Sequence, residues 1–78
     1  MHVVIAKVDE VYFDGEAHSL TVPGSMGEMT VLGHHMPLVT TLKKGEIVVR
    51  EGEGHAGKTF HIESGVMEVR QDGATVIL

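Results

Sequence analysis

The chain has 78 residues, a formal net charge of −5 and no cysteine. This length allows one domain, residues 1–78, and excludes a separate active-site domain. Without disulfides or thiolate metal ligands, hydrophobic packing or a partner must stabilise the fold. The 11 acidic residues outnumber the 6 basic ones, which are scattered without a cluster, and this disfavours nucleic acid as a partner.

The N-terminus does not resemble a signal peptide, because the opening MHVVIAKVDE has neither a basic region nor a long apolar run. No stretch of the chain is apolar for the roughly 18 residues that a membrane-spanning helix needs. We therefore expect any membrane association to go through another subunit.

Apolar and polar residues alternate in short runs along the chain. In the first run, Val4, Ala6 and Val8 share one apolar face, and further alternating runs follow at residues 59–63 and 67–70. A period of two predicts half-buried strands. No segment places apolar residues at i, i+3, i+4 and i+7 over about 10 to 12 residues, so we expect essentially no helix.

Glycine-containing turn signals separate these runs, and glycine accepts the positive φ that tight turns require. In chain order they are Asp14-Gly15, Pro23-Gly24, Lys44-Gly45, Ser64-Gly65 and Asp72-Gly73. The polar, glycine-rich segment 51–58 predicts a longer loop between two strands. Many short strands at close spacing predict an all-β fold of two packed antiparallel sheets, a sandwich or flattened barrel.

Residues 22–45, VPGSMGEMTVLGHHMPLVTTLKKG, form the most informative block of the sequence. They resemble the epsilon subunit of F-type ATP synthases, which is called delta in mitochondria. Its motifs are Gly-Glu-Leu-Gly-Ile-Leu, Pro-Gly-His-Ala-Pro-Leu-Leu-Thr and Leu-Lys-Pro-Gly. The matching residues are Pro23, Gly24, Gly27, Glu28, Val31, Leu32, His35, Pro37, Leu38, Thr40, Leu42, Lys43 and Gly45. The departures are Thr30, Gly33, His34, Met36 and Lys44.

The resemblance covers nearly the whole chain. Residues 13–17 are similar to the family's Phe-Xaa-Gly-Glu-Ala segment, residues 60–69 to its Phe-Xaa-Val-Xaa-Gly-Gly-Phe-Xaa-Glu-Val run, and residues 74–78 to its last strand. Family members usually continue into a C-terminal helical hairpin, and this chain stops just before it. The roles of that hairpin are therefore not carried onto these residues.

The resemblance implies that the loop Ser25, Met26, Gly27 and Glu28 faces the membrane-embedded c-ring. There an acidic side chain would pair with arginines of the ring. Judged from residue chemistry alone, Glu28 is a solvated loop charge, so that alternative stays open.

The resemblance also implies a surface that packs on the gamma subunit. It comprises His35, Met36, Pro37, Leu38 and Thr40, with His35 at the histidine of the family motif. On residue chemistry alone, Met36 and Leu38 belong equally well to a core. His34 stands where the family has glycine, so no role is carried onto it.

Six histidines raise the question of a metal site. The neighbouring His34 and His35 are the strongest pair, but adjacent side chains on a strand point to opposite faces. The His-Xaa-His spacing of a cupin-like metal enzyme is absent. We therefore expect surface or interface histidines, no metal and no cofactor.

The sequence carries no recognisable catalytic motif. It has no Ser-His-Asp context, no Walker A pattern and no GxGxxG after a strand. With three aromatic residues in all, the chain offers little to line a pocket. We expect no catalytic residue.

The resemblance identifies the chain as the N-terminal β-sandwich domain of an epsilon subunit, either shortened or naturally short. It implies a non-catalytic rotor subunit that couples the c-ring to the gamma subunit during ATP synthesis. Its place would be peripheral, on the cytoplasmic face of an energy-transducing membrane, the plasma membrane in bacteria. Two alternatives remain: a freestanding small β-barrel that binds a metal or small ligand through histidines, and a sandwich adaptor with another partner.

Overall fold

The alternating runs form strands in the computed structural model, which describes residues 1–34, 36–54 and 56–78. The strands are β1 (His2–Lys7), β2 (Glu10–Glu16), β3 (Ser19–Gly24), β4 (Gly27–Leu32), β5 (Leu38–Leu42), β6 (Gly45–Arg50), β7 (Lys58–Ile62), β8 (Gly65–Arg70) and β9 (Gly73–Ile77). No described residue is helical, and the part of the chain described here has no helix able to cross a membrane. The predicted all-β class is confirmed.

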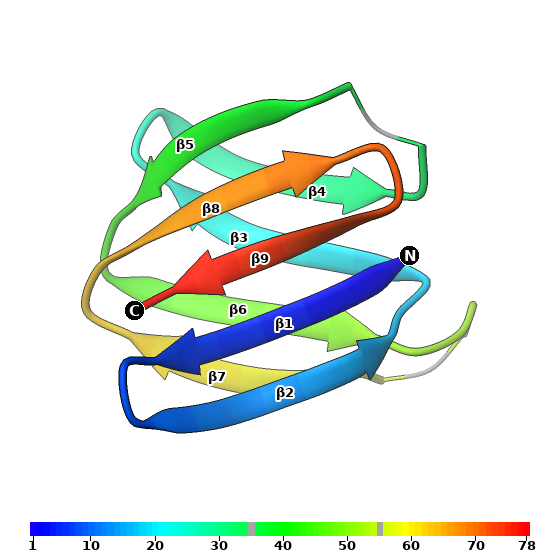
Figure 1. Ribbon diagram of the computed structural model, residues 1–78, viewed down its shortest axis with the longest axis horizontal. Helices are drawn as coiled ribbons and strands as arrows, with labels where there is room; N and C mark the ends of the chain where they lie inside the picture. Colours follow the sequence, from blue (N-terminus) through cyan, green and yellow to red (C-terminus); the bar gives the residue numbers. More distant parts are fainter. Residues whose placement is uncertain (35, 55) are drawn as a thin grey trace.

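The strands form two packed layers that are parts of one curled sheet (Figure 1). The front layer has the order β2-β1-β9-β8-β5, and the back layer has the order β4-β3-β6-β7. All strand pairs are antiparallel except β1 with β9, which are parallel. The predicted β-sandwich is thus confirmed, with its first and last strands side by side.

The core lies between the layers and is filled by aliphatic side chains, one methionine and Phe13. Its largest fully buried members are Val3, Ile5, Leu20, Val22, Val31, Ile47, Val49, Met67, Val69 and Val76. Burying one such side chain contributes roughly 1.5 to 3 kcal/mol, so many small contributions hold this domain together. Since these residues alternate along their strands, the opposite faces remain outside.

Two sequence expectations differ from the structure. The face of Val4, Ala6 and Val8 is the outer face of the front layer, while Val3 and Ile5 supply the core. The predicted turn at Asp14-Gly15 is wrong, because β2 continues to Glu16 and Gly15 pairs with Val3. A Cβ at Gly15 would only make ordinary contact with the Phe13 ring, at 3.7 Å, so the strand does not require glycine at this position.

The two layers meet along two seams. At the paired seam, β3 and β5 are joined through Gly24 and Leu42. Two backbone hydrogen bonds extend this link, from the Ser25 amide to the Thr41 carbonyl (3.0 Å) and from the Lys43 amide to the Pro23 carbonyl (2.9 Å). The paired seam is therefore closed by main chain.

At the open seam, β2 and β7 are the edge strands of the two layers and are not paired with each other. The Phe13 and Phe60 rings meet there edge to face, with centroids 6.4 Å apart and planes at 70°. The Lys58 ammonium lies 5.4 Å from the centroid of the Phe13 ring. Side chains alone thus close this seam.

Candidate interaction surfaces

The β3–β4 hairpin presents the loop that, by the family resemblance, is expected to face the c-ring. Gly24 pairs with Gly27, which leaves Ser25 and Met26 as the two turn residues. Gly27 has a φ of 134°, a conformation that favours glycine. The Thr41 hydroxyl donates to the Ser25 hydroxyl at 2.9 Å and ties the turn to β5. The turn is consequently held against the rest of the sandwich.

At the tip of this turn, the Met26 side chain is 99% exposed, and Glu28 is exposed at the start of β4. A fully exposed methionine on a fixed turn buries its apolar surface only against another molecule. The turn thus combines one apolar and one acidic contact group.

The same end of the sandwich carries three other hairpin turns and the end of β9 (Figure 1). We call it the hairpin end. Val8, at the β1–β2 turn, is fully exposed there. Lys43 and Lys44 are also exposed, at the β5–β6 turn. Sequence reasoning placed Val8 on a strand face and so missed this second apolar tip.

The predicted gamma-facing residues fall into three groups. His35 lies outside the described residues. Met36 and Pro37 are exposed ahead of β5, whereas Leu38 and Thr40 point inward and are half-buried, with Leu38 packed against the core. The sequence set therefore does not form one continuous exposed surface.

The exposed residues of β5 are instead Val39 and Thr41. Thr41 pairs with Val66, Val66 with Ile77, and Ile77 with Ala6. The same row reaches Val11, the partner of Ala6 on β2. These outward side chains thus cross the whole front layer, a placement that only the strand register reveals.

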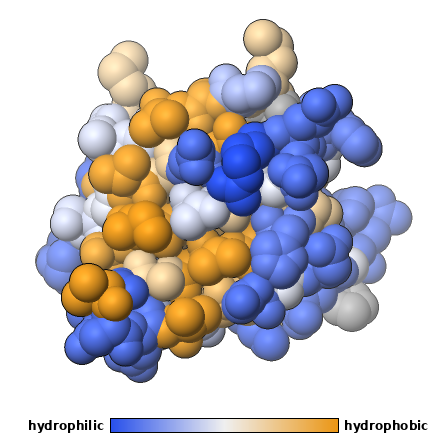
Figure 2. Space-filling model, in the orientation of Figure 1, coloured by the Kyte–Doolittle hydropathy of each residue, from blue (hydrophilic) through white to orange (hydrophobic). Residues whose placement is uncertain are grey.

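Val66, Ile77, Ala6 and Val11, together with Val39, which lies two residues before Thr41 on the outer face of β5, form what we call the apolar row. Its valines and isoleucine are between 43% and 70% exposed. Figure 2 shows apolar side chains gathered on the hairpin-end half of this face, with hydrophilic ones on the other half. A contiguous exposed apolar patch is typical of a protein interface.

Ion pairs occupy the hydrophilic half of the front layer. The His2 imidazole lies between Asp14 and Glu16, with its Nε2 2.7 Å from Asp14 Oδ1 and its Nδ1 3.3 Å from Glu16 Oε2. Arg70 Nη1 lies 3.1 Å from Glu68 Oε1. These pairs are exposed and each contributes little to stability, so they do not hold the fold together.

The histidines do not assemble into a metal centre within the described residues. No group of three or more His, Cys, Asp or Glu side chains there could hold an ion. His34 has a φ of 64°, which is uncommon for a residue with a side chain, and it is exposed in the turn after β4. His35 lies outside the described residues, and so does the geometry of the His34-His35 pair.

Comparison with known protein families gives a match over residues 1–78 to the "ATP synthase, Delta/Epsilon chain, beta-sandwich domain". The ATP synthase epsilon chains of Laribacter hongkongensis and Caulobacter vibrioides are 35% and 31% identical to this chain over 77 residues. Each alignment covers 99% of this chain, but 55% of the first relative and 87% of the second. The chain thus spans about half the length of the Laribacter protein and most of the Caulobacter protein.

Solved structures give the same fold. A chain in the Euglena gracilis mitochondrial ATP synthase, OSCP/F1/c-ring, is 26% identical, with a TM-score of 0.81 over 96% of this chain and 48% of its own length. A chain in the Tetrahymena thermophila mitochondrial ATP synthase, central stalk/c-ring, has a TM-score of 0.78 at 18% identity, over 99% of this chain and 61% of its own. The second likeness supports the fold alone.

Proposed function

Because the chain belongs to the delta/epsilon family of ATP synthase subunits, we propose that it works as a non-catalytic part of the rotor. In this role it couples the c-ring to the gamma subunit while ATP is made on other chains. It is peripheral to the energy-transducing membrane, on the cytoplasmic face of the plasma membrane in a bacterium. The membrane is reached only through the complex.

The observation that carries this proposal is the presence of two unlike surfaces on one small body. The apolar row covers half of the front layer, and the hairpin end presents isolated apolar tips among charged and polar residues. A coupling element must bind two different partners at once, and interfaces with an apolar centre and a polar rim suit that task.

The apolar row is the surface we assign to the gamma subunit. Val39, Val66 and Ile77 supply the contact area, and Met36 and Pro37 extend it ahead of β5. His35 remains a proposed contact on the basis of the family motif. Leu38 and Thr40 act from inside, because they fix the position of β5 and hence the direction of its outward side chains.

The hairpin end is the surface we assign to the c-ring. Met26 projects as an apolar contact, Ser25 and Gly27 fix the turn, and Glu28 offers a carboxylate to a basic group of the ring. An exposed ion pair of this kind contributes about 0.2 to 1 kcal/mol. It therefore sets orientation more than affinity.

The test is binding of the purified gamma subunit, measured by isothermal titration calorimetry. The Val66→Asp variant would bury a carboxylate without a partner, and we expect it to bind about tenfold or more weakly than the unchanged chain. The matched control is Leu32→Asp, since Leu32 is 51% exposed, beside 43% for Val66, but lies on the outer face of the back layer.

Loss of binding in Val66→Asp with full binding in Leu32→Asp supports the assignment. Equal effects of the two changes, or no binding by the folded unchanged chain, contradict it. Backbone amide spectra of each variant verify that the comparison is made between folded proteins.

A further inference from the structure

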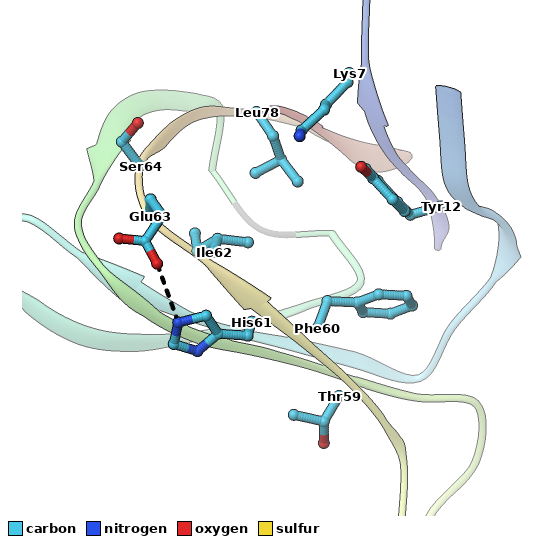
Figure 3. A pocket seen from close by; sticks show the side chains of 9 residues that line it. All are labelled: Lys7, Tyr12, Thr59, Phe60, His61, Ile62, Glu63, Ser64 and Leu78. Carbon is cyan, nitrogen blue, oxygen red and sulfur yellow. Dashed lines mark hydrogen bonds and ion pairs between the residues drawn. The ribbon is translucent and has the colours of Figure 1, made fainter. Parts of the chain in front are cut away.

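The open seam ends in a cavity of about 470 Å³ at the hairpin end of the molecule. Its size lies within the range of about 300 to 1,000 Å³ that small-molecule sites usually have. The lining residues come from the end of β1, from β2, from β7 and its following turn, and from the last residue after β9 (Figure 3). The sequence offered little to line a pocket, yet two of its three aromatic residues, Tyr12 and Phe60, do so here.

The inner side of the cavity is apolar. Ile62 is buried, and Phe60 and Leu78 are half-buried and packed against the core. These side chains come from both layers, and the Phe60 ring separates the cavity from the closed part of the seam, where it meets Phe13. A bound molecule would thus place an apolar body against them.

The mouth of the cavity carries two hydrogen-bond donors. In Figure 3 the Lys7 ammonium and the Tyr12 hydroxyl lie on the same side of the lining, and the Lys7 ammonium ends near Leu78. Among residues 1–34, 36–54 and 56–78, neither group has a hydrogen bond or ion pair. Because Lys7 is a cation, this arrangement favours an anionic acceptor.

A β-bulge sets the direction of Tyr12. Ile5 pairs with Phe13 and Ala6 pairs with Val11, so Tyr12 is an extra residue on β2 with no partner on β1. Phe13 is buried and Val11 is exposed although they are two residues apart, so the bulge interrupts the alternation along β2. A bulge re-aims the side chain it contains, and here it brings the phenol to the cavity mouth.

The acidic residue of the lining forms no ion pair with Lys7. Glu63 turns toward His61, and its Oε2 lies 3.2 Å from His61 Nε2 (Figure 3). The lining therefore contains a single lysine and a carboxylate already engaged elsewhere. This balance suits a ligand with one negative charge better than a multiply charged phosphate.

We propose that this cavity binds a small monocarboxylate with an apolar body, such as a short fatty acid. The carboxylate accepts hydrogen bonds from Lys7 and Tyr12, and the hydrocarbon part packs on Phe60, Ile62 and Leu78. The cavity lies at the hairpin end, which is the surface proposed to face the c-ring, but carboxylate binding by the isolated chain does not depend on the rotor function.

The experiment is a titration of the isotope-labelled chain with hexanoate, followed in amide and methyl NMR spectra. Saturable shifts at Tyr12, Ile62 and Leu78 in the millimolar range are expected. Hexanol has the same hydrocarbon body without the charge, and we expect it to bind more weakly.

Two variants test the named donors, and one serves as the matched control. Lys7→Gln should weaken hexanoate binding about two- to fivefold, as expected for a partly exposed ion pair. Tyr12→Phe removes one hydroxyl and keeps the ring, and it should weaken binding by a similar factor. Lys44→Gln makes the same change of charge at an exposed turn outside the cavity and should leave binding unchanged.

Saturable shifts confined to the cavity, together with weaker binding in Lys7→Gln but not in Lys44→Gln, support the proposal. It is overturned if hexanoate causes no saturable shift, if the shifts spread over the surface, or if hexanol binds as well as hexanoate. Binding to the gamma subunit is measured separately, so neither result decides the other.

Discussion

The paired seam and the open seam close the same curled sheet by different means. At the paired seam, backbone hydrogen bonds join β3 to β5, and the Thr41 and Ser25 hydroxyls reinforce them. At the open seam, the Phe13 and Phe60 rings and Lys58 close one part, while the rest remains a cavity. Backbone pairing fixes register but leaves no room, whereas side-chain closure leaves space that a ligand can use.

The largest expected effect comes from removing the aromatic closure. Phe13 is buried, so Phe13→Ala should lower the free energy of unfolding by about 3 to 5 kcal/mol. For a domain of this size, that loss approaches the whole stability. Urea denaturation followed by circular dichroism measures it. Phe13→Leu, which keeps most of the volume, should lose clearly less; equal losses would show that the ring contact has no special part in closing the seam.

A smaller effect is expected at the paired seam from Gly24→Ala. A Cβ at Gly24 would lie 2.7 Å from the Gly27 carbonyl oxygen, so the hairpin must shift and the free energy of unfolding should fall by about 1 to 3 kcal/mol. The control is Gly33→Ala, where a Cβ would meet nothing within 4 Å. If both changes cost the same in urea denaturation, close backbone packing is not what limits this seam.

The smallest effect is expected from Lys58→Gln at the open seam. It removes the cation over Phe13 and the contact of Lys58 Nζ with Glu51 Oε1 at 3.6 Å, and it should cost about 0.5 to 1 kcal/mol. Glu51→Gln removes only the ion pair and should cost less. If the two variants are equally stable at high salt, where ion pairs are screened, the lysine contributes nothing through the ring.

Fold class could be predicted from the sequence because period-two alternation and glycine turns recur throughout the chain. The face that β5 exposes could not be predicted, since LVTTL offers apolar or β-branched side chains in both phases. Only pairing with β8 shows that Val39 and Thr41 point outward. The turn predicted at Asp14-Gly15 was wrong because this dipeptide is also tolerated inside a strand, as it is in β2.

The interaction loops could be predicted in part. Ser25 to Glu28 form a fixed exposed turn at the place expected, because the glycines and the short spacing dictate a hairpin. The geometry of the turn does not identify its binding partner, and the assignment to the c-ring depends on the family. The cavity could not be foreseen, because Lys7, Tyr12, Ile62 and Leu78 are far apart in the chain and a bulge decides where Tyr12 points.

The parallel pairing of β1 with β9 has a consequence for how the domain is synthesised. β1 leaves the ribosome first, yet one of its two neighbours is the last strand of the sheet to appear. Until then, one edge of β1 is unpaired, and pairing across nearly the whole sequence must precede completion of the front layer. Contacts of such long range slow folding. A nascent chain that ends before β9 should therefore expose an unpaired, aggregation-prone edge of β1. The domain should become stable only after β9 has been synthesised.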